Sequence, residues 1–165
     1  MDESGVRTDL TRHYGRGPRG HRVRESSPGG RWRTLTILGA IRRTGWVAAM
    51  TIEAATDGDI FLAYLDQVLC PRLRRGDVVV MDNLAAHKVA GVRERVEAAG
   101  AEVLYLPPYS PDFNPIESCW AQIKQLLRAA KARSLSMLKS CLDQALAAVT
   151  PQAVQACFRH GGYGL

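Results

Sequence analysis

Two acidic residues in the second half of the chain are candidates for chemistry. Asp82 directly follows the apolar run Val78–Met81, which is typical of a buried parallel strand that ends at the edge of a sheet. Glu117 follows Asn114 and Pro115, which favour the start of a helix. The two acids are separated by 34 residues. We therefore expect a carboxylate at a strand end and a carboxylate at a helix start to face the same small volume.

Each of these acids also has a structural interpretation. An Asn, a Pro and then a Glu at the third helical position form a capping box, and an Asp after a strand often begins a turn. A third acid, Asp2, favours a catalytic over a structural interpretation, because three carboxylates can hold two divalent cations about 3.5–4 Å apart. Mg²⁺ binds a few carboxylates and completes its coordination with water and phosphate oxygens. Three acids brought together would repel one another, so the set implies a metal.

Three segments carry a resemblance to a known family: "DESG", "MDNLAAH" and "LPPYSPDFNPIESCW". Through them the chain resembles the catalytic core of insertion-sequence transposases of the mariner-like superfamily, which are RNase H-like nucleases with an Asp-Asp-Glu triad. The spacing of 34 residues is characteristic of that group, and the resemblance extends to the ending "FRHGGYGL". It implies that Asp2, Asp82 and Glu117 are catalytic and bind two Mg²⁺ ions, for which Mn²⁺ could substitute.

The same resemblance implies an activity and partners. We expect metal-dependent cleavage and strand transfer of double-stranded DNA, at transposon ends and target, by a homodimer. Residues of the second and third motifs are expected to support the metal ligands or to contact DNA: Asn83, His87 and Asn114. For His87 the alternative is an exposed histidine at a helix start. Trp120, one turn after Glu117, is interpreted as a core anchor.

Two other functions fit the sequence less well. The first is an inactive or frameshifted transposase remnant with at most non-specific nucleic-acid binding. The second is an RNase H-like ribonuclease that acts on RNA–DNA hybrids, which the "SPDFNPIES" stretch disfavours. Metal-dependent cleavage of a DNA strand separates the transposase from the remnant.

The N-terminal quarter of the chain is rich in arginine. Residues 1–43 contain ten arginines, four acids and no lysine, in a chain of net charge +6. Arginine binds phosphate bidentately, so an arginine-only segment indicates an anionic polymer as its partner. The residues expected to bind nucleic acid lie in the Gly/Pro-rich part: Arg16, Arg19, Arg22 and Arg24. The alternative is a solvated loop whose arginines reflect codon bias.

The pattern of apolar residues predicts an α/β protein. We expect an RNase H-like mixed sheet with helices on both faces. The loop that carries Tyr109 and Phe113 either packs onto the sheet or stacks on unpaired bases. The expected elements are a strand hairpin (32–41 and 46–53), a helix (60–69), a strand (78–81), a helix (87–99), a strand (102–106), helices from Pro115 and over 135–149, and a short turn after Thr150.

A central strand should precede the hairpin, and its place in the sequence is the N-terminus. Residues 1–31 otherwise predict an irregular basic connection. In the resembled family an apolar strand leads up to the first acid, whereas only Met1 stands before Asp2 here. We therefore expect the first strand to be truncated and the chain to be the C-terminal part of a longer transposase. Its helix-turn-helix domains would come from an upstream region or a separate reading-frame product.

The length and composition fit a single domain over residues 1–165, and the resemblance implies that it is an Asp-Asp-Glu transposase catalytic domain. No run of about 18 apolar residues and no signal peptide is present, which favours a cytoplasmic protein. The four cysteines lack zinc-site spacing, so free thiols are expected. Cys157 and His160 alone would not complete a zinc site.

Overall fold

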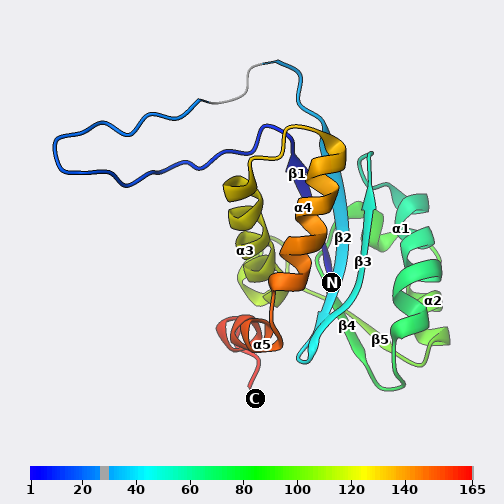
Figure 1. The fold of residues 1–165 in the computed structure, drawn as a ribbon. Coiled ribbons are helices and arrows are strands. Elements are labelled where there is room, and N and C mark those ends of the chain that lie inside the picture. Colours follow the sequence, from blue (N-terminus) through cyan, green and yellow to red (C-terminus); the bar gives the residue numbers. More distant parts are fainter. Residues whose placement is uncertain (27–29, 165) are drawn as a thin grey trace.

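The computed structural model describes residues 1–26 and 30–164. Helices cover both faces of a central group of strands, and a long arm leaves the body between the first two strands (Figure 1). This arrangement confirms the predicted α/β class with helices on both faces. No helix in the described residues has the length and hydropathy needed to cross a bilayer.

Three strands form an antiparallel sheet in the order β1-β2-β3: Asp2–Arg7, Thr34–Arg42 and Gly45–Ile52. The β2–β3 pairing confirms the predicted hairpin. Strand β2 is buried along most of its length, as expected of a strand with neighbours on both sides and helices on both faces.

A parallel pair of strands lies on the other side of β1. Strands β4 (Val78–Met81) and β5 (Glu102–Tyr105) pair in register, close to the predicted ranges. The amino group of Met1 donates to the carbonyl oxygen of Val80 at 2.7 Å. The start of β1 therefore lies beside the end of β4. Asp2 is the residue after Met1, and Asp82 is two residues after Val80, so both acids are next to this contact.

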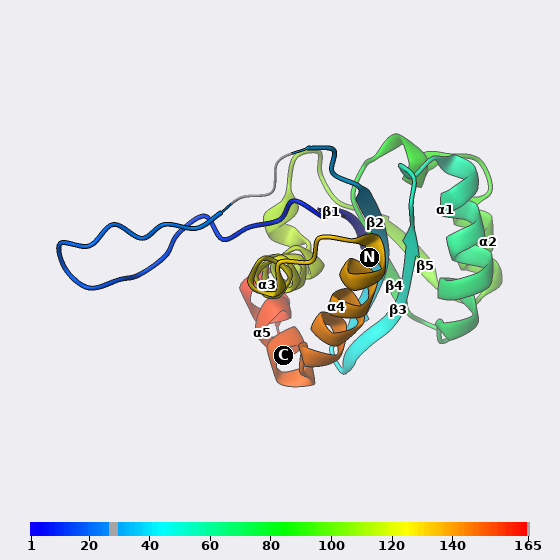
Figure 2. The same cartoon turned by 45° about the horizontal axis from the view of Figure 1, so that its top comes forward.

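The helices form two groups. On the β4–β5 side lie α1 (Gly58–Tyr64), which continues as further helical turns to Arg72, and α2 (Val92–Ala98). On the opposite side lie α3 (Pro115–Ala130), α4 (Leu135–Ala148) and α5 (Pro151–His160), as Figures 1 and 2 show. Each group buries its own apolar cluster against the strands.

Two helix predictions are corrected. The helix predicted to begin at His87 begins at Val92, because a short turn (Ala85–Lys88) and the left-handed Gly91, with φ 93°, come first. The short turn predicted after Thr150 is a ten-residue helix. The Thr150 side chain caps this helix by accepting from the backbone N–H of Ala153 at 3.2 Å.

The expectation of an irregular connection throughout residues 1–31 is also corrected. Strand β1 begins at Asp2 and continues for six residues after Met1, paired with β2 from Asp2–Gly39 to Arg7–Thr34. The sequence "DESGVR" lacks the apolar run that predicts a buried strand, so it reads as part of the basic connection. Burial of Asp2, Ser4 and Val6 on one face shows that pairing with β2 determines its conformation.

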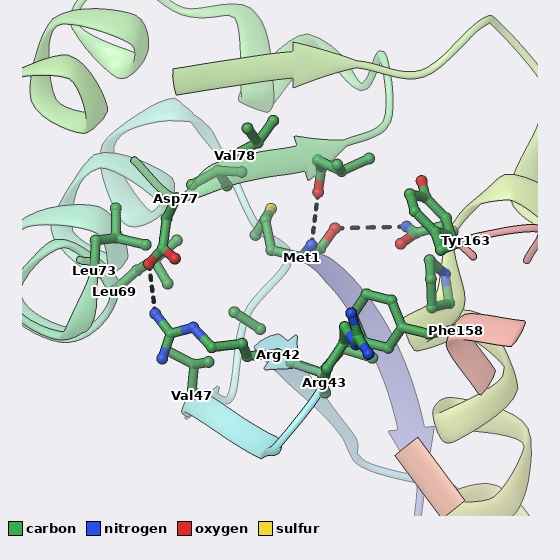
Figure 3. A pocket seen from close by; sticks show the side chains of 16 residues that line it. Met1, Arg42, Arg43, Val47, Leu69, Leu73, Asp77, Val78, Phe158 and Tyr163 are labelled. Atoms are coloured by element: carbon green, nitrogen blue, oxygen red, sulfur yellow. Dashed lines mark hydrogen bonds and ion pairs between the residues drawn. The ribbon is translucent and has the colours of Figure 1, made fainter. Parts of the chain in front are cut away.

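A cavity of about 230 Å³ lies between β2 and β4, below Met1 (Figure 3). An ion pair between Arg42 and Asp77 crosses it and joins the β2–β3 turn to the start of β4. Burial raises the pKa of Asp77, but hydrogen bonds from the backbone N–H of Arg74 and from Arg42 outweigh it and hold the pKa below the ordinary value of 3.8. Folding therefore favours the ionised carboxylate.

We expect Asp77→Asn to lower the free energy of unfolding at pH 7 by about 1 kcal/mol, because it removes the charge that Arg42 pairs with. A depressed pKa contributes stability that is complete above the unfolded value of 3.8 and is lost as the pH falls through the folded value. Thermal unfolding of both proteins from pH 7 to pH 2 should show curves that converge below pH 3.8. A constant difference across this range would contradict the assignment.

Candidate active site

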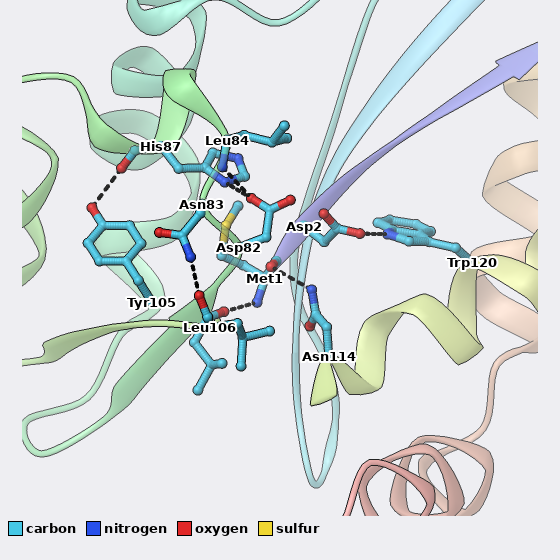
Figure 4. Close-up of polar contacts among 11 residues, drawn as sticks. Met1, Asp2, Asp82, Asn83, Leu84, His87, Tyr105, Leu106, Asn114 and Trp120 are labelled. Carbon is cyan, nitrogen blue, oxygen red and sulfur yellow. Dashed lines mark hydrogen bonds and ion pairs between the residues drawn. The ribbon is translucent and has the colours of Figure 1, made fainter. Parts of the chain in front are cut away.

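Asp82 directly follows β4, where the predicted strand end places it. Its Oδ1 accepts from the backbone N–H of Leu84 at 3.0 Å and lies 2.6 Å from Nδ1 of His87 (Figure 4). Burial raises the pKa of Asp82, but the hydrogen bonds from His87 and Leu84 hold it below its usual range. The side chain is 38% exposed, so an ionised carboxylate with a fixed orientation faces open space.

His87 is fully buried, so the exposed-histidine alternative is wrong. Its ring packs against Phe61, with ring centroids 4.4 Å apart and an interplanar angle of 41°, and its backbone carbonyl oxygen accepts from the hydroxyl of Tyr105 at 2.7 Å. Phe61 of α1 thus holds the ring of His87, and Tyr105 of β5 holds its backbone. His87 therefore holds Asp82 in place and does not reach the surface.

Two asparagines fasten the backbone around the acids. The side-chain amide of Asn83 donates to the carbonyl oxygen of Leu106, which joins the ends of β4 and β5. The side-chain amide of Asn114 donates to the carbonyl oxygen of Met1 at 3.5 Å, which joins the start of α3 to the start of β1. Asn114 makes no side-chain cap on α3, so the capping-box interpretation is wrong. Its side chain is buried and points to β1 instead of to its own helix.

Asp2 is buried, with 4% of its surface exposed. Its Oδ2 accepts from the indole N–H of Trp120 at 3.1 Å (Figure 4). Burial, followed by the charge of Glu117, raises the pKa of Asp2 to about 7, and Asp82 acts in the same direction. The three acids therefore lie within electrostatic reach of one another.

Asp82 and Glu117 line one cavity of about 460 Å³, together with Asn83 and Asn114. It lies between the ends of β4 and β5, the loop of residues 106–111 and the first turn of α3. Within residues 1–26 and 30–164, no three His, Cys, Asp or Glu side chains are close enough together to hold one ion. The structure thus places Asp82 and Glu117 at one cavity. Asp2 lies close enough to interact with the charges of both.

The four predicted nucleic-acid-binding arginines lie elsewhere. Arg16, Arg19, Arg22 and Arg24 are exposed on a projecting segment, residues 9–26, which we call the basic arm (Figures 1 and 2). Its tip is a turn in which the backbone N–H of His21 donates to the carbonyl oxygen of Pro18. Contacts with the body of the protein hold the arm at its first residues and again at Glu25.

Two residues that follow α3 make these contacts with the arm. Arg133 donates to the carbonyl oxygens of Thr8 and Leu10, at 3.2 and 3.0 Å. Lys131 forms an ion pair with Glu25. These contacts connect the base of the basic arm to the helix that carries Glu117.

Sequence reasoning missed two roles. Trp120 is buried at 1% exposure, which confirms the core-anchor interpretation, but it also donates to Asp2, and no local pattern predicts a contact across 118 residues. Lys88 lines the cavity of Asp82 and Glu117, and its position next to His87 in the second motif was the available signal. Tyr109 and Phe113 are exposed at 103% and 54%, so the packing alternative for their loop is wrong.

The four cysteines are free thiols, as predicted: Cys70, Cys119, Cys141 and Cys157. The Sγ atoms of Cys119 and Cys157 lie 3.4 Å apart in the core between α3 and α5. Burial is the main cause that raises the pKa of the Cys119 thiol above its usual range. These cysteines pack as small apolar residues.

A comparison with protein families identifies the class of this fold and site. Residues 1–139 match the sequence model described as DDE superfamily endonuclease. The chain therefore belongs to the DDE endonuclease superfamily, which confirms the family predicted from the three motifs. No curated protein matches the chain.

Solved structures of one mariner transposase, Mos1, share the fold. The Mos1 strand transfer complex superposes with a TM-score of 0.75 at 19% identity over 96% of this chain and 49% of that chain. The Mos1 paired-end complex with the left transposon end gives 0.76 at 17% identity over 96% and 50%. The Mos1 catalytic domain with Raltegravir and Mg gives 0.64 at 19% identity over 77% and 69%. The chain thus spans about half the length of Mos1 in its complexes and has the RNase H-like fold of the Mos1 catalytic domain.

Proposed function

We propose that residues 1–165 are the catalytic domain of an insertion-sequence transposase of the mariner-like kind, which cleaves DNA strands and joins the freed 3′ ends to a target. The observation that carries this proposal is the cavity shared by Asp82 and Glu117, with Asp2 within electrostatic reach. Membership of the DDE endonuclease superfamily supports it. The Mos1 complexes with transposon ends have the same fold, which is further support.

The residues at the cavity fit a pair of hard divalent cations. The donors are carboxylate oxygens, which Mg²⁺ and Mn²⁺ favour, and three neighbouring carboxylates repel one another unless a cation offsets their charge. Both bonds of Asp82 use Oδ1, so Oδ2 is the oxygen that would bind metal. Asp2, Asp82 and Glu117 would hold two ions, which when bound would stabilise charge on the attacking and leaving oxygens.

The residues around the acids then have separate tasks. His87 and Leu84 orient Asp82, while Asn83 and Asn114 hold the backbone on either side of the cavity. Lys88, exposed at the cavity wall, is placed to neutralise a DNA phosphate. Tyr109, whose side chain is free in solvent, is available to stack on an unpaired base.

The proposed partners are double-stranded DNA and a second copy of the chain. Transposon ends and target DNA would lie along the cavity and the basic arm, whose exposed arginines supply positive charge. A homodimer would bring two active sites to the two transposon ends. Sequence-specific binding of those ends is assigned to a helix-turn-helix region encoded upstream or as a separate product.

Nicking of supercoiled plasmid DNA tests the proposed activity. The purified chain should convert plasmid to nicked product with Mg²⁺ or Mn²⁺ and should not do so with EDTA. An RNA–DNA hybrid of equal length should remain uncut. Cleavage of the hybrid alone would favour a ribonuclease, and no metal-dependent cleavage of either substrate would favour the inactive remnant.

The basic arm should bind the DNA backbone without reading its sequence. Four arginines of the arm are replaced by alanine: Arg16, Arg19, Arg22 and Arg24. This change should weaken binding to duplexes of unrelated sequence by the same factor. The salt dependence should fall by about one unit of slope for each phosphate that the arm no longer neutralises. Fluorescence anisotropy with two unrelated duplexes across a salt series measures both quantities. Arg93→Ala, an exposed arginine on α2, is the matched control.

Unchanged binding in the control would show that loss of an exposed arginine outside the arm does not weaken binding. Weaker binding to one duplex only, with the salt slope unchanged, would show that the basic arm reads sequence.

A further inference from the structure

Trp120 has a contact that a core residue does not need. It lies one turn after Glu117 in α3, and its indole N–H donates to Oδ2 of the buried Asp2 at 3.1 Å (Figure 4). A buried tryptophan can be accommodated by apolar packing together with any hydrogen-bond acceptor. Here the acceptor is one of the three acids of the proposed site.

The strand opposite Asp2 is adapted to this contact. Asp2 pairs with Gly39 on β2. A Cβ atom on Gly39 would lie 2.6 Å from Cη2 of Trp120 and 3.1 Å from Cζ3 of Trp46. These separations are shorter than ordinary carbon contacts, so a side chain at residue 39 would displace the Trp120 ring. Glycine there leaves room for the indole to reach Asp2.

A second tryptophan, Trp46, packs against the first in this cluster. The rings of Trp46 and Trp120 pack with centroids 5.3 Å apart and an interplanar angle of 40°. The two differ in one respect, since the indole nitrogen of Trp46 is buried with no hydrogen-bond partner among the described residues. The cluster thus contains one indole N–H directed to an acid and one that is not.

We propose that Trp120 is a positioning residue for metal binding, which fixes the Asp2 carboxylate through its indole N–H, and that Gly39 makes room for it. This inference rests on the proposed function, because it assumes that Asp2 binds metal. The hydrogen bond occupies Oδ2 and restricts rotation of the carboxylate, so the other oxygen has a defined direction. Contacts of this type, behind a metal ligand, are typically worth about 10- to 100-fold in metal affinity.

Two matched variants test the inference: Trp120→Phe and Trp46→Phe. Each replaces an indole by a smaller aromatic ring in the same cluster, but only the first removes the hydrogen bond to Asp2. Binding of Mn²⁺ alone, followed by electron paramagnetic resonance, should be at least about tenfold weaker in Trp120→Phe than in the unmodified chain. Trp46→Phe should bind Mn²⁺ as the unmodified chain does, although both variants should be less stable in thermal unfolding.

A third variant, Gly39→Ala, keeps both indoles and should weaken Mn²⁺ binding by displacing Trp120. Equal Mn²⁺ affinity in Trp120→Phe and the unmodified chain, or an equal decrease in the two Trp variants, would overturn the inference while leaving the proposed function intact. Absence of Mn²⁺ binding by the unmodified chain would overturn both.

Discussion

Asp82→Asn and Glu117→Gln are each expected to reduce metal-dependent DNA cleavage by at least about a thousandfold. A metal ligand contributes to several kcal/mol of transition-state stabilisation, and each 1.36 kcal/mol is a factor of about ten in rate. Both substitutions remove a negative charge and almost no volume. In Asp82→Asn an oxygen remains that can accept from the backbone N–H of Leu84, so the local fold should persist.

DNA binding should survive these changes, because phosphate contacts fix the position of the duplex independently of the acids. Cleavage under single-turnover conditions with Mg²⁺, together with anisotropy for affinity, separates the two effects. Asp143→Asn is the matched control, since Asp143 is an exposed acid on α4. Substantial Mg²⁺-dependent cleavage by either active-site variant would refute the assignment of that acid.

Phe61→Ala is expected to lower the free energy of unfolding by about 3–5 kcal/mol. Phe61 is fully buried in the cluster between α1 and the strands, where its ring packs against Tyr64 and His87. Truncation leaves a cavity and removes the ring against which His87 packs. The decrease in stability should therefore be accompanied by weaker metal binding, because His87 orients Asp82.

Thermal and denaturant unfolding measure the first effect, and Mn²⁺ titration measures the second. Phe113→Ala is the control, because Phe113 is 54% exposed and its truncation should change stability by no more than about 0.5 kcal/mol. A Phe61→Ala protein as stable as the control would show that this cluster does not support the fold as described.

The elements with a strong periodic pattern were predictable from the sequence. The parallel strand β4 and the β2–β3 hairpin have continuous apolar runs with clear ends, and the structure has them within about two residues of the expected bounds. Strand β1 could not be found in this way, because its sequence DESGVR contains no run of apolar residues. Its conformation depends on pairing with β2, which follows it only after the basic arm.

That Asp82 and Glu117 come together was predictable, but their surroundings were not. Sequence motifs single out Asp82 and Glu117, and the structure places both at one cavity. The contacts that hold the site are long-range: Asn114 reaches Met1 across 113 residues, and Trp120 reaches Asp2 across 118. Local rules favoured a helix cap for Asn114, and the buried position of its side chain beside β1 prevailed over that preference.

Anomalous diffraction from crystals grown with Mn²⁺ tests most directly whether Asp2, Asp82 and Glu117 form one metal site. We expect two Mn²⁺ peaks about 4 Å apart in the cavity beside β4 and α3. Oxygens of all three acids should lie about 2 Å from the ions. Peaks remote from Asp82 and Glu117, or a cavity without Mn²⁺ at concentrations that support cleavage, would contradict the proposed site.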